Sequence, residues 1–340
     1  MRAAVLREFG AGLDVTQVPD PTPGPGDAIV RTGAAGVCRT DLKVVDGVVP
    51  TVPLPIVPGH ELAGEVVAVG AGVDAAAIGT RVLVGLDLSC GDCAYCVVGE
   101  LDHCQRLRRL GMEVDGALGE FVRVPAANLV PLPGDLSYAD AATVADAVAS
   151  PYHAVVGGAD VRPGQIVAVY GLGGLGLATV QIARTAGAEV IGIARTPARR
   201  ELAEELGASW TVDPRDGPVS EQIRDRTDGL GVHAFFDIVG IEGSIDQGVR
   251  SCRKGGRVVV LGYMVSEAVA PMLRLVYDEV SVAGSRGSTR ADLRAALRLV
   301  GDGRVRTVIG DRVQLGEVNA ALDRLRAGTT IGRAVVEFPA

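Results

Sequence analysis

The chain has 340 residues, of which 48% are hydrophobic and 22% are charged, and its formal net charge is −8. This length favours two domains, each with its own core, and the composition is that of an ordinary globular protein. The acidic balance and the few aromatic residues argue against nucleic acid as a partner, because phosphate binding requires clustered lysine and arginine.

No segment predicts secretion or a membrane span. The apolar stretch near the start, residues 3–6, is too short for the apolar region of a signal peptide. Residues 166–183 form a run of eighteen residues without a charge, which is long enough to suggest a membrane helix. Four glycines within six positions of this segment have a better explanation, given below. We therefore expect a cytoplasmic protein with no membrane partner.

Residues 1 to about 148 predict mostly β structure, because short alternating apolar runs are separated by turns rich in proline and glycine. These runs cover residues 3–6, 28–32, 62–69, 81–84 and 120–124. Ser137 and Asp140 resemble a capping box, so a helix is expected to begin there. Pro151 should break or kink that helix.

Residues from about 150 to 285 predict a parallel sheet covered by helices on both faces. Apolar strands are expected at residues 166–170, 190–194, 210–212, 234–239, 258–262 and 280–284. Helical patterns lie between several of them, such as residues 197–206, which end at Gly207. Six apolar strands alternating with helices are typical of a complete doubly wound (Rossmann) dinucleotide-binding domain.

The tail after Gly284 predicts two helices and a strand. The first helix is capped by Thr289 with Asp292, the second lies near residues 317–326, and the strand covers residues 333–338. We assign this tail to the first domain. The predicted fold is therefore mixed α/β, with a β-rich domain of residues 1–149 and 286–340 and an inserted doubly wound domain of residues 150–285.

Four of the six cysteines lie within fifteen residues, in a short lobe of residues 89–105: Cys90, Cys93, Cys96 and Cys104. Without a secretion signal, such clustering indicates metal binding rather than disulfides. Four thiolates around one zinc ion close its tetrahedron and make a structural site.

A second zinc site is indicated by Cys38 and His60, since thiolate and imidazole both suit zinc. Thr40 could pass on a proton from an alcohol, and Asp41 could hold the non-ligating nitrogen of His60. A catalytic zinc needs a third protein ligand. Asp146, which lies among apolar neighbours and needs a charged partner, is one candidate. Glu61 is the other.

A glycine-rich turn follows the strand at residues 166–170 and opens a helix. It fits the pattern G-x-G-x-x-G, and its members are Gly171, Leu172, Gly173, Gly174, Leu175 and Gly176. In this context the glycines allow a tight turn and a close approach to a pyrophosphate at the helix N-terminus. We therefore expect a dinucleotide to bind there.

The end of the next strand bears on the choice of coenzyme. An acidic residue usually binds the ribose 2′-hydroxyl of NAD at this point. Here the sequence places Ala194, Arg195 and Thr196, followed by Arg199 and Arg200. Small and basic residues suit a 2′-phosphate, so NADP(H) is favoured over the alternative, NAD(H).

Together these motifs resemble the zinc-dependent medium-chain alcohol dehydrogenases over the whole chain. The resemblance rests on the segments around Cys38 and His60, the cysteine lobe, the glycine turn and Gly332-Arg333. It implies a GroES-like catalytic domain, an active site in the cleft between the domains, and two zinc ions per chain. Asp146 would be the third ligand of the catalytic zinc, as in bacterial secondary-alcohol dehydrogenases.

The resemblance also implies how the coenzyme and the proton are handled. Arg333 would lie near the coenzyme pyrophosphate, and Ser150 and Leu261 are further expected contacts of the coenzyme. Proton loss through Thr40 would accompany hydride transfer to the nicotinamide, with zinc as a Lewis acid. Lys43 stands where many members carry a histidine that ends the proton relay.

The predicted activity is the interconversion of an alcohol, expected to be secondary, and its carbonyl compound. The substrate side lacks the usual aromatic residue and offers Leu86, Val48 and Val49 instead. A polyol dehydrogenase of the same superfamily is the nearest alternative, and a non-enzymatic zinc- or nucleotide-binding protein is an alternative of another class. We expect a homodimer or a homotetramer.

Overall fold

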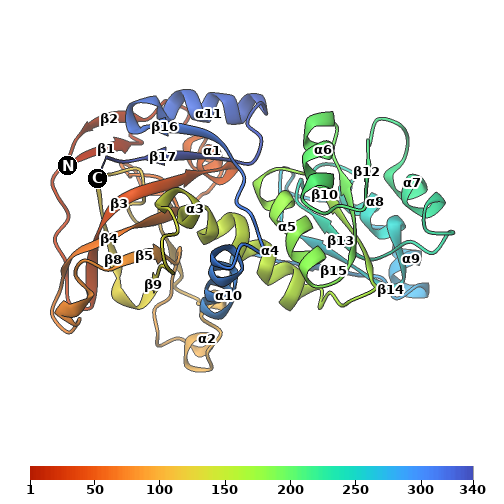
Figure 1. Cartoon of the computed structure of the whole chain (residues 1–340), viewed down its shortest axis with the longest axis horizontal. Coiled ribbons are helices and arrows are strands. Elements are labelled where there is room, and N and C mark those ends of the chain that lie inside the picture. The colour runs from red at the N-terminus through yellow and green to blue at the C-terminus, as the bar shows by residue number, and fades with distance from the viewer. Residues whose placement is uncertain (340) are drawn as a thin grey trace. The chain divides into compact units, whose positions relative to one another are not determined.

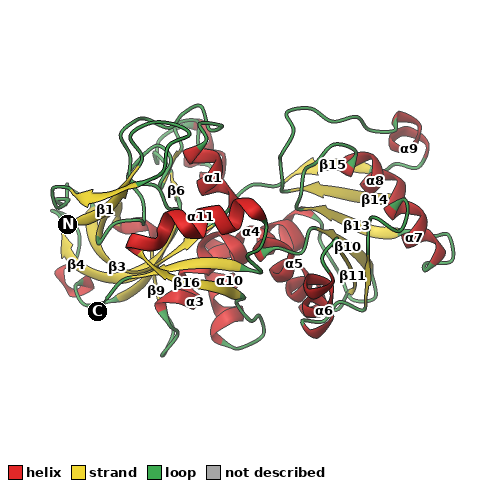
Figure 2. Cartoon of the chain, turned by 90° about the horizontal axis from the view of Figure 1, so that it is seen from above, coloured by secondary structure: helices red, strands yellow, loops and turns green. Residues whose placement is uncertain are grey.

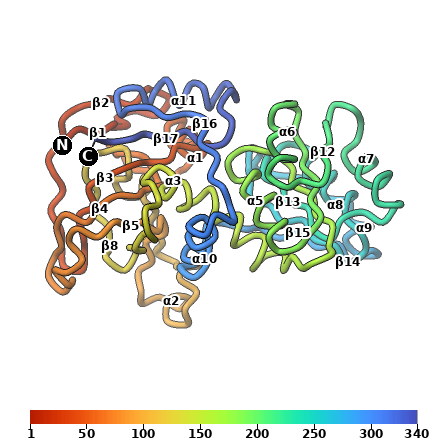
Figure 3. Tube along the Cα trace, viewed as in Figure 1, coloured from red at the N-terminus to blue at the C-terminus, as the bar shows by residue number. Residues whose placement is uncertain are grey.

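The computed structural model describes residues 1–339, and the chain divides into two compact units. Unit 1 comprises Met1–Ala149, Gly287–Asp302 and the chain from Thr307 onward, and unit 2 comprises Ser150–Arg286 and Gly303–Arg306. The tail returns to unit 1, where its blue trace runs beside the red and orange strands (Figure 3). We assigned Gly303–Arg306 to the first domain with the rest of the tail, but this segment belongs to unit 2. There Gln181 accepts from the Arg306 N–H at 2.8 Å and donates to the Arg306 carbonyl at 2.9 Å.

Unit 1 is built on a seven-stranded sheet in the order β16-β17-β3-β4-β5-β9, with β8 also paired to β3 (Figure 1). All pairs are antiparallel except β16 with β17. The strands of this unit are β1 (Arg2–Val5), β2 (Asp14–Gln17), β3 (Asp27–Val37), β4 (Glu61–Val69), β5 (Arg81–Val84), β6 (Asp87–Leu88), β7 (Arg108–Arg109), β8 (Phe121–Pro125), β9 (Leu129–Pro131), β16 (Ile309–Gln314) and β17 (Arg333–Glu337). Its helices are α1 (Arg39–Val45), α2 (Ala94–Val97), α3 (Tyr138–Thr143), α10 (Arg290–Gly301) and α11 (Val318–Ala327).

The helix α3 packs closely on this sheet because the residues between them are small. Ala34 and Ala63 of the sheet contact Ala139 and Ala142 of α3, and all four are buried. A side chain at Gly33 would lie 2.2 Å from Tyr138 Cδ2, so glycine is required there. As predicted, α3 begins at Ser137, whose Oγ accepts a hydrogen bond from the Asp140 N–H.

The chain does not break at Pro151. The helical backbone runs from α3 through a π-helical turn at Val144–Val148, then α4 (Ala149–Tyr152), then a second π-helical turn at His153–Gly158. The helix is therefore not broken at Pro151, and the other predicted outcome, a kink, stays a prediction. Proline lacks an N–H, and the wider π-helical turns on either side change the hydrogen-bond register around it.

Unit 2 is a parallel sheet in the order β12-β11-β10-β13-β14-β15. Its strands are β10 (Ile166–Tyr170), β11 (Glu189–Ile193), β12 (Trp210–Val212), β13 (Val232–Asp237), β14 (Cys252–Val260) and β15 (Ser281–Gly284). Its helices are α5 (Gly174–Thr185), α6 (Pro197–Glu205), α7 (Val219–Asp225), α8 (Ser244–Ser251) and α9 (Met272–Tyr277). Figure 2 shows α5 and α6 on one face and α8 on the other. The predicted fold class is confirmed.

Within the described residues, the longest helices are too short or too polar to cross a bilayer.

Candidate functional site

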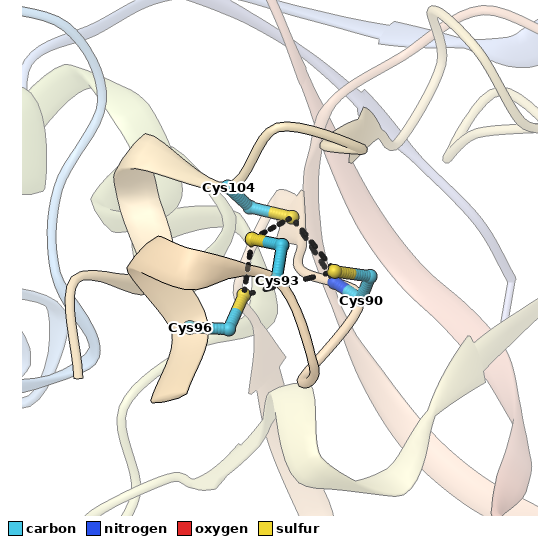
Figure 4. Close-up of side chains that lie close together, drawn as sticks. All are labelled: Cys90, Cys93, Cys96 and Cys104. Carbon is cyan, nitrogen blue, oxygen red and sulfur yellow. Dashed lines mark hydrogen bonds between the residues drawn. The ribbon is translucent and has the colours of Figure 1, made fainter. Parts of the chain in front are cut away.

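The four cysteines of the lobe converge on one point (Figure 4). The Sγ–Sγ distances are 3.3 Å for Cys90–Cys104, 3.5 Å for Cys93–Cys96, and 3.9 Å for both Cys90–Cys96 and Cys93–Cys104. Four sulfurs placed ~2.3 Å from a zinc ion would form a tetrahedron with edges of about 3.8 Å. The sulfurs are therefore spaced as a zinc ion requires, and all four thiols are free of disulfides.

The backbone of the lobe stabilises the thiolate form of Cys93. Hydrogen bonds from the N–H groups of Gln105 and Cys96 lower the pKa of Cys93 to about 6. Since the thiolate is the metal-binding form, this loop favours binding before any ion arrives.

Cys38 and His60 are placed by two local features of unit 1. Cys38 follows β3 directly and caps α1, where its Sγ accepts from the Thr40 N–H at 3.2 Å. His60 follows Gly59, which has φ +99°, and the carbonyl of Gly59 accepts from the Ala117 N–H at 2.9 Å. A side chain at Gly59 would meet the Leu118 nitrogen at 2.9 Å. Glycine is thus required for both the turn and the close approach.

Asp41 fixes both of these residues at once. Its Oδ2 accepts from the Cys38 N–H at 2.8 Å, and its Oδ1 lies 3.1 Å from His60 Nδ1. A ring nitrogen that donates to a carboxylate leaves the other nitrogen with a free lone pair. In that neutral tautomer the lone pair of His60 Nε2 is available to a metal ion, and Nε2 lies 3.3 Å from Cys38 Sγ.

Asp146 completes this cluster from the π-helical turn Val144–Val148. Its Oδ2 lies 3.7 Å from His60 Nε2, and the candidate ligand atoms of Cys38, His60 and Asp146 all lie within 4.8 Å of one another. Burial lowers the pKa of His60, but the charges of Asp41 and Cys38 outweigh it and raise this pKa well above its usual value. A buried group of anionic donors attracts a cation, and a thiolate, an imidazole and a carboxylate suit zinc.

Glu61 is fully buried and is bound by groups other than the three candidate ligands. It forms a bidentate ion pair with Arg333, whose Nε and Nη2 lie 2.9 and 2.7 Å from Oε1, and both side chains are buried. The same Oε1 accepts from the Ala147 N–H at 3.1 Å. A side chain at Gly36 would come within 1.8 Å of Glu61 Oε2, so the carboxylate fills the space that this glycine leaves. Burial raises the pKa of Glu61 to about 7, although Arg333 lowers it.

Arg333 links this ion pair to Asp146. Its Nη2 donates to Asp146 Oδ2 at 2.8 Å, so Arg333 is the charged partner that a carboxylate among apolar residues requires. The sequence pattern did not indicate this contact. We expected Arg333 near a coenzyme pyrophosphate, and that role stays a prediction.

The residues predicted to carry the proton lie on α1. Thr40 is half-buried in its first turn, two residues beyond Cys38. Lys43 lies one turn further, where burial lowers the pKa of its amine to about 8, against the raising effect of Cys38.

The glycine turn of unit 2 has the shape of a dinucleotide site. Gly171 has φ +104°, and a side chain at Gly176 would lie 1.7 Å from the Gly171 carbonyl oxygen, so these two glycines are required by the fold. Gly173 differs, because a Cβ there would meet no protein atom within 4 Å and its φ is −93°. Its missing side chain leaves space at the N-terminus of α5, where a pyrophosphate would bind.

The end of β11 differs in one respect from our expectation. Arg200 donates to the Ala194 carbonyl at 2.7 Å and to Asp213 at 2.8 Å, while Arg215 pairs with the same carboxylate and bonds the Arg195 carbonyl at 2.7 Å. Arg200 is therefore engaged within the protein. Arg195 and Thr196 are exposed at this edge, and Arg199 is half-buried.

The remaining coenzyme candidates of unit 2 lie at other element ends. Ser150 is buried in α4, and Leu261 follows β14 directly. Their contact with a coenzyme stays a prediction.

Comparisons with known proteins agree with this arrangement. The family model of the alcohol dehydrogenase GroES-like domain matches residues 24–134, and that of the zinc-binding dehydrogenases matches residues 174–302. An alcohol dehydrogenase of Geobacillus stearothermophilus is 36% identical over 341 residues, which are 99% of both chains. A solved NAD-dependent alcohol dehydrogenase is 32% identical over the whole of both chains, with a TM-score of 0.93. A structure from Sinorhizobium meliloti 1021 bound to NADP, described as a zinc-binding dehydrogenase, is 32% identical over 99% of both chains, with a TM-score of 0.90.

A GroES-like unit and a complete dinucleotide-binding unit in one chain define a class of nicotinamide-dependent oxidoreductases. The full-length similarity shows that the chain belongs to the zinc-dependent medium-chain alcohol dehydrogenase family. It is an enzyme, a zinc-dependent alcohol oxidoreductase that uses a nicotinamide coenzyme and acts on a small-molecule alcohol. The predicted family and alcohol dehydrogenase activity are confirmed, while the preference for a secondary alcohol stays a prediction.

Proposed function

We propose that the enzyme oxidises secondary alcohols to ketones, and reduces ketones in reverse, with one structural and one catalytic zinc ion per chain. Cys90, Cys93, Cys96 and Cys104 would hold the structural ion. The observation that carries the proposal is the convergence of Cys38, His60 and Asp146 within 4.8 Å in unit 1, apart from the cysteine lobe. Three protein ligands leave one position of a tetrahedral zinc ion for the substrate oxygen.

Asp146, rather than Glu61, is the proposed third ligand. Glu61 is already held by Arg333 and by the Ala147 N–H. Two consecutive residues at the start of a strand also point to opposite faces. Glu61 would instead support the π-helical turn that carries Asp146.

The chain's own residues would then divide the work as follows. When bound, zinc supplies a Lewis acid and the nicotinamide supplies a hydride acceptor. Asp41 keeps the His60 imidazole in the tautomer and orientation that ligation needs. Thr40 would take the proton of the substrate hydroxyl, and Lys43, further along the same helix face, is the proposed route onward to solvent.

The proposed coenzyme site lies in unit 2. The turn from Gly171 to Gly176 would bind the pyrophosphate, supported by the open space beside Gly173. Unit 1 would bind the substrate and the catalytic zinc, and the boundaries near residues 149 and 286 would separate these roles.

Small apolar residues support a preference for secondary alcohols. Val49 and Leu86 are buried and Val48 is 58% exposed, so the proposed lining offers methyl groups and no aromatic ring. The test compares kcat/KM for a secondary alcohol, a primary alcohol of equal carbon number and a hexitol. We expect the secondary alcohol to be the best substrate. A preference for the hexitol would favour the polyol dehydrogenase alternative.

For the coenzyme, we propose a preference for NADP(H). Ala194 is buried and offers no acceptor to a 2′-hydroxyl, whereas Arg195 and Arg199 can supply positive charge to a 2′-phosphate. Asp213 does not oppose this, because Arg200 and Arg215 neutralise it.

Replacing Ala194 with aspartate is expected to reverse the coenzyme preference. The new carboxylate would accept from the 2′-hydroxyl of NAD and repel the 2′-phosphate of NADP, a difference of about 10- to 100-fold in kcat/KM for a charged hydrogen-bond site. The measurement is kcat/KM for both coenzymes with one alcohol. Ala194→Asn is the matched control, since it adds the same bulk without the charge. A parent enzyme, with Ala194 in place, that prefers NAD would contradict the proposal.

We further propose a homodimer or higher oligomer formed through β15. This strand is at the edge of the parallel sheet, and Val282 on it is 39% exposed. The preceding helix α9 exposes Met272, Leu273, Val276 and Tyr277. An exposed edge strand beside an apolar surface favours pairing with a second copy about a two-fold axis.

Val282→Lys is expected to yield monomers, because a charge on an edge strand opposes strand pairing. Light scattering coupled to gel filtration measures this directly. Arg257→Lys, on the neighbouring strand β14, keeps its charge and should leave the mass unchanged. A monomeric parent enzyme would refute this interface.

A further inference from the structure

A buried carboxylate at the end of β13 lies outside the sites described above. Asp237 is the last residue of this strand and is 0% exposed. Its Oδ1 accepts from the N–H groups of Val239 and Gly240, at 3.1 and 2.9 Å, and its Oδ2 accepts from Ser244 Oγ at 2.5 Å. All three donors belong to the loop after β13 or to the first residue of α8. The side chain therefore fixes the path of that loop.

The main chain at this position joins two further strand ends. The Asp237 carbonyl accepts from the N–H groups of Leu261 and Gly262, at 2.9 and 3.0 Å, just beyond β14. The next residue, Ile238, donates to the Tyr170 carbonyl at 2.9 Å, at the end of β10. The loops after β10, β13 and β14 are thus bonded to one another around Asp237.

Glycines show how closely these three loops pack. A side chain at Gly171 would lie 2.6 Å from Val239 Cγ1. A side chain at Gly240, whose φ is +58°, would lie 2.1 Å from the Gly262 carbonyl oxygen. The three loops therefore form one continuous wall, and a shift of the middle loop would move the other two.

This wall stands where a doubly wound sheet binds its ligand. β10 is the first strand of the sheet and lies between β11 and β13, so the strand order reverses beside it. Ligands of such sheets bind beyond the carboxyl ends of the strands at this point. The loop that Asp237 holds is therefore one side of the crevice.

The geometry points to Asp237 as a positioning residue for the nicotinamide coenzyme. Its carboxylate keeps Val239, Gly240 and Ser244 in place, so the crevice has its binding shape before the coenzyme arrives. Such preorganisation lowers the ordering cost of binding. The inference rests on the proposed coenzyme site at the turn from Gly171 to Gly176.

The test is steady-state kinetics of the zinc-loaded enzyme with varied NADP or NAD, whichever supports faster turnover. Asp237→Ala is expected to raise KM for the coenzyme by about ten-fold or more, as for other displaced binding groups. It should leave kcat at saturating coenzyme near the parent value. Asp237→Asn should restore KM, because its amide oxygen can accept from Val239 and Gly240. Its amide nitrogen can donate to Ser244 Oγ, which has the Ile241 carbonyl 2.7 Å away as an acceptor.

Two further variants keep the test decisive. Asp246→Ala removes a carboxylate from the same helix, where it pairs with Arg250, and should not change KM. Ser244→Ala removes only one of the three hydrogen bonds, so it reports on the loop even if Asp237→Ala does not fold, and it should raise KM by a smaller factor. A lowered melting temperature with unchanged KM in the folded variants would mean that Asp237 is merely structural and would overturn the inference.

Gly173→Val separates this inference from the proposed coenzyme site. The added side chain meets no protein atom near its Cβ, so the fold should tolerate it, but it would occupy the pyrophosphate position. If Gly173→Val raises KM and Asp237→Ala does not, only the role of Asp237 fails. If Gly173→Val leaves KM unchanged, the coenzyme site itself is misplaced and the inference fails with it.

Discussion

Replacing Cys38 with serine is expected to abolish alcohol oxidation while the protein stays folded. Serine has the shape of cysteine but does not supply a thiolate, so the proposed catalytic site loses one of its three ligands. Zinc acting as a Lewis acid stabilises the charge that develops in the transition state by several kcal/mol. Losing this stabilisation corresponds to a fall in kcat of about a thousand-fold or more. Initial rates with saturating alcohol and coenzyme measure the loss, and circular dichroism confirms the fold.

The other cysteines provide the controls for this experiment. Cys93→Ser makes the same change in the lobe, where it should lower the thermal stability but leave activity in the molecules that remain folded. Cys252 is buried in unit 2 and belongs to neither cluster, so Cys252→Ser should keep near-parent kcat. Near-parent kcat in Cys38→Ser would show that Cys38 does not hold a catalytic ion.

Arg333→Met is expected to destabilise the protein by about 3–5 kcal/mol, because it leaves the buried carboxyl of Glu61 without its ion-pair partner. Glu61 has no exposed side-chain surface, so water cannot replace the guanidinium. Asp146 loses its ion pair with the same group. Denaturant unfolding, followed at the transition of unit 1, measures the free energy lost.

A double variant separates the lost charge balance from the lost packing. Glu61→Gln combined with Arg333→Met removes both charges and should recover more than half of the stability lost in Arg333→Met. Arg250→Met breaks an exposed ion pair on α8 and should cost less than about 1 kcal/mol. If Arg333→Met also costs less than about 1 kcal/mol, the Glu61–Arg333 pair is not important for stability.

The features that the sequence predicted well are local in the chain. The lobe cysteines are held by a short segment, so their spacing alone indicates that they meet. The strands of unit 2 are short apolar runs bounded by turns, and four of them, such as β10 at Ile166–Tyr170, match the expected bounds or miss them by one residue. Periodicity and capping depend on neighbours a few residues away, which is why such elements are predictable.

The features that the sequence did not reveal depend on contacts between distant segments. Glu61 and Arg333 are 272 positions apart, and their pairing follows from β17 and β4 flanking β3 in the sheet. The space for Glu61 is left by Gly36, which the sequence presents only as another glycine in a strand. Arg200 was expected to serve the coenzyme, but Asp213 on the next strand's end engages it. Each of these outcomes is set by tertiary packing.

Pro151 is a different case, because proline usually ends a helix, whereas here the helical backbone continues past it with a π-helical turn on either side. π-helical turns are frequent at functional sites. Here one of the two carries Asp146 and thereby aims a carboxylate at His60. A regular α-helix would give this side chain another direction.

The most direct test of the account is anomalous scattering at the zinc absorption edge from crystals of the enzyme. We expect two peaks per chain. One should lie among Cys90, Cys93, Cys96 and Cys104, and the other at about 2.0–2.3 Å from Cys38 Sγ, His60 Nε2 and a carboxylate oxygen of Asp146. A single peak in the cysteine lobe, or a second peak bound by Glu61 with Asp146 turned away, would contradict it.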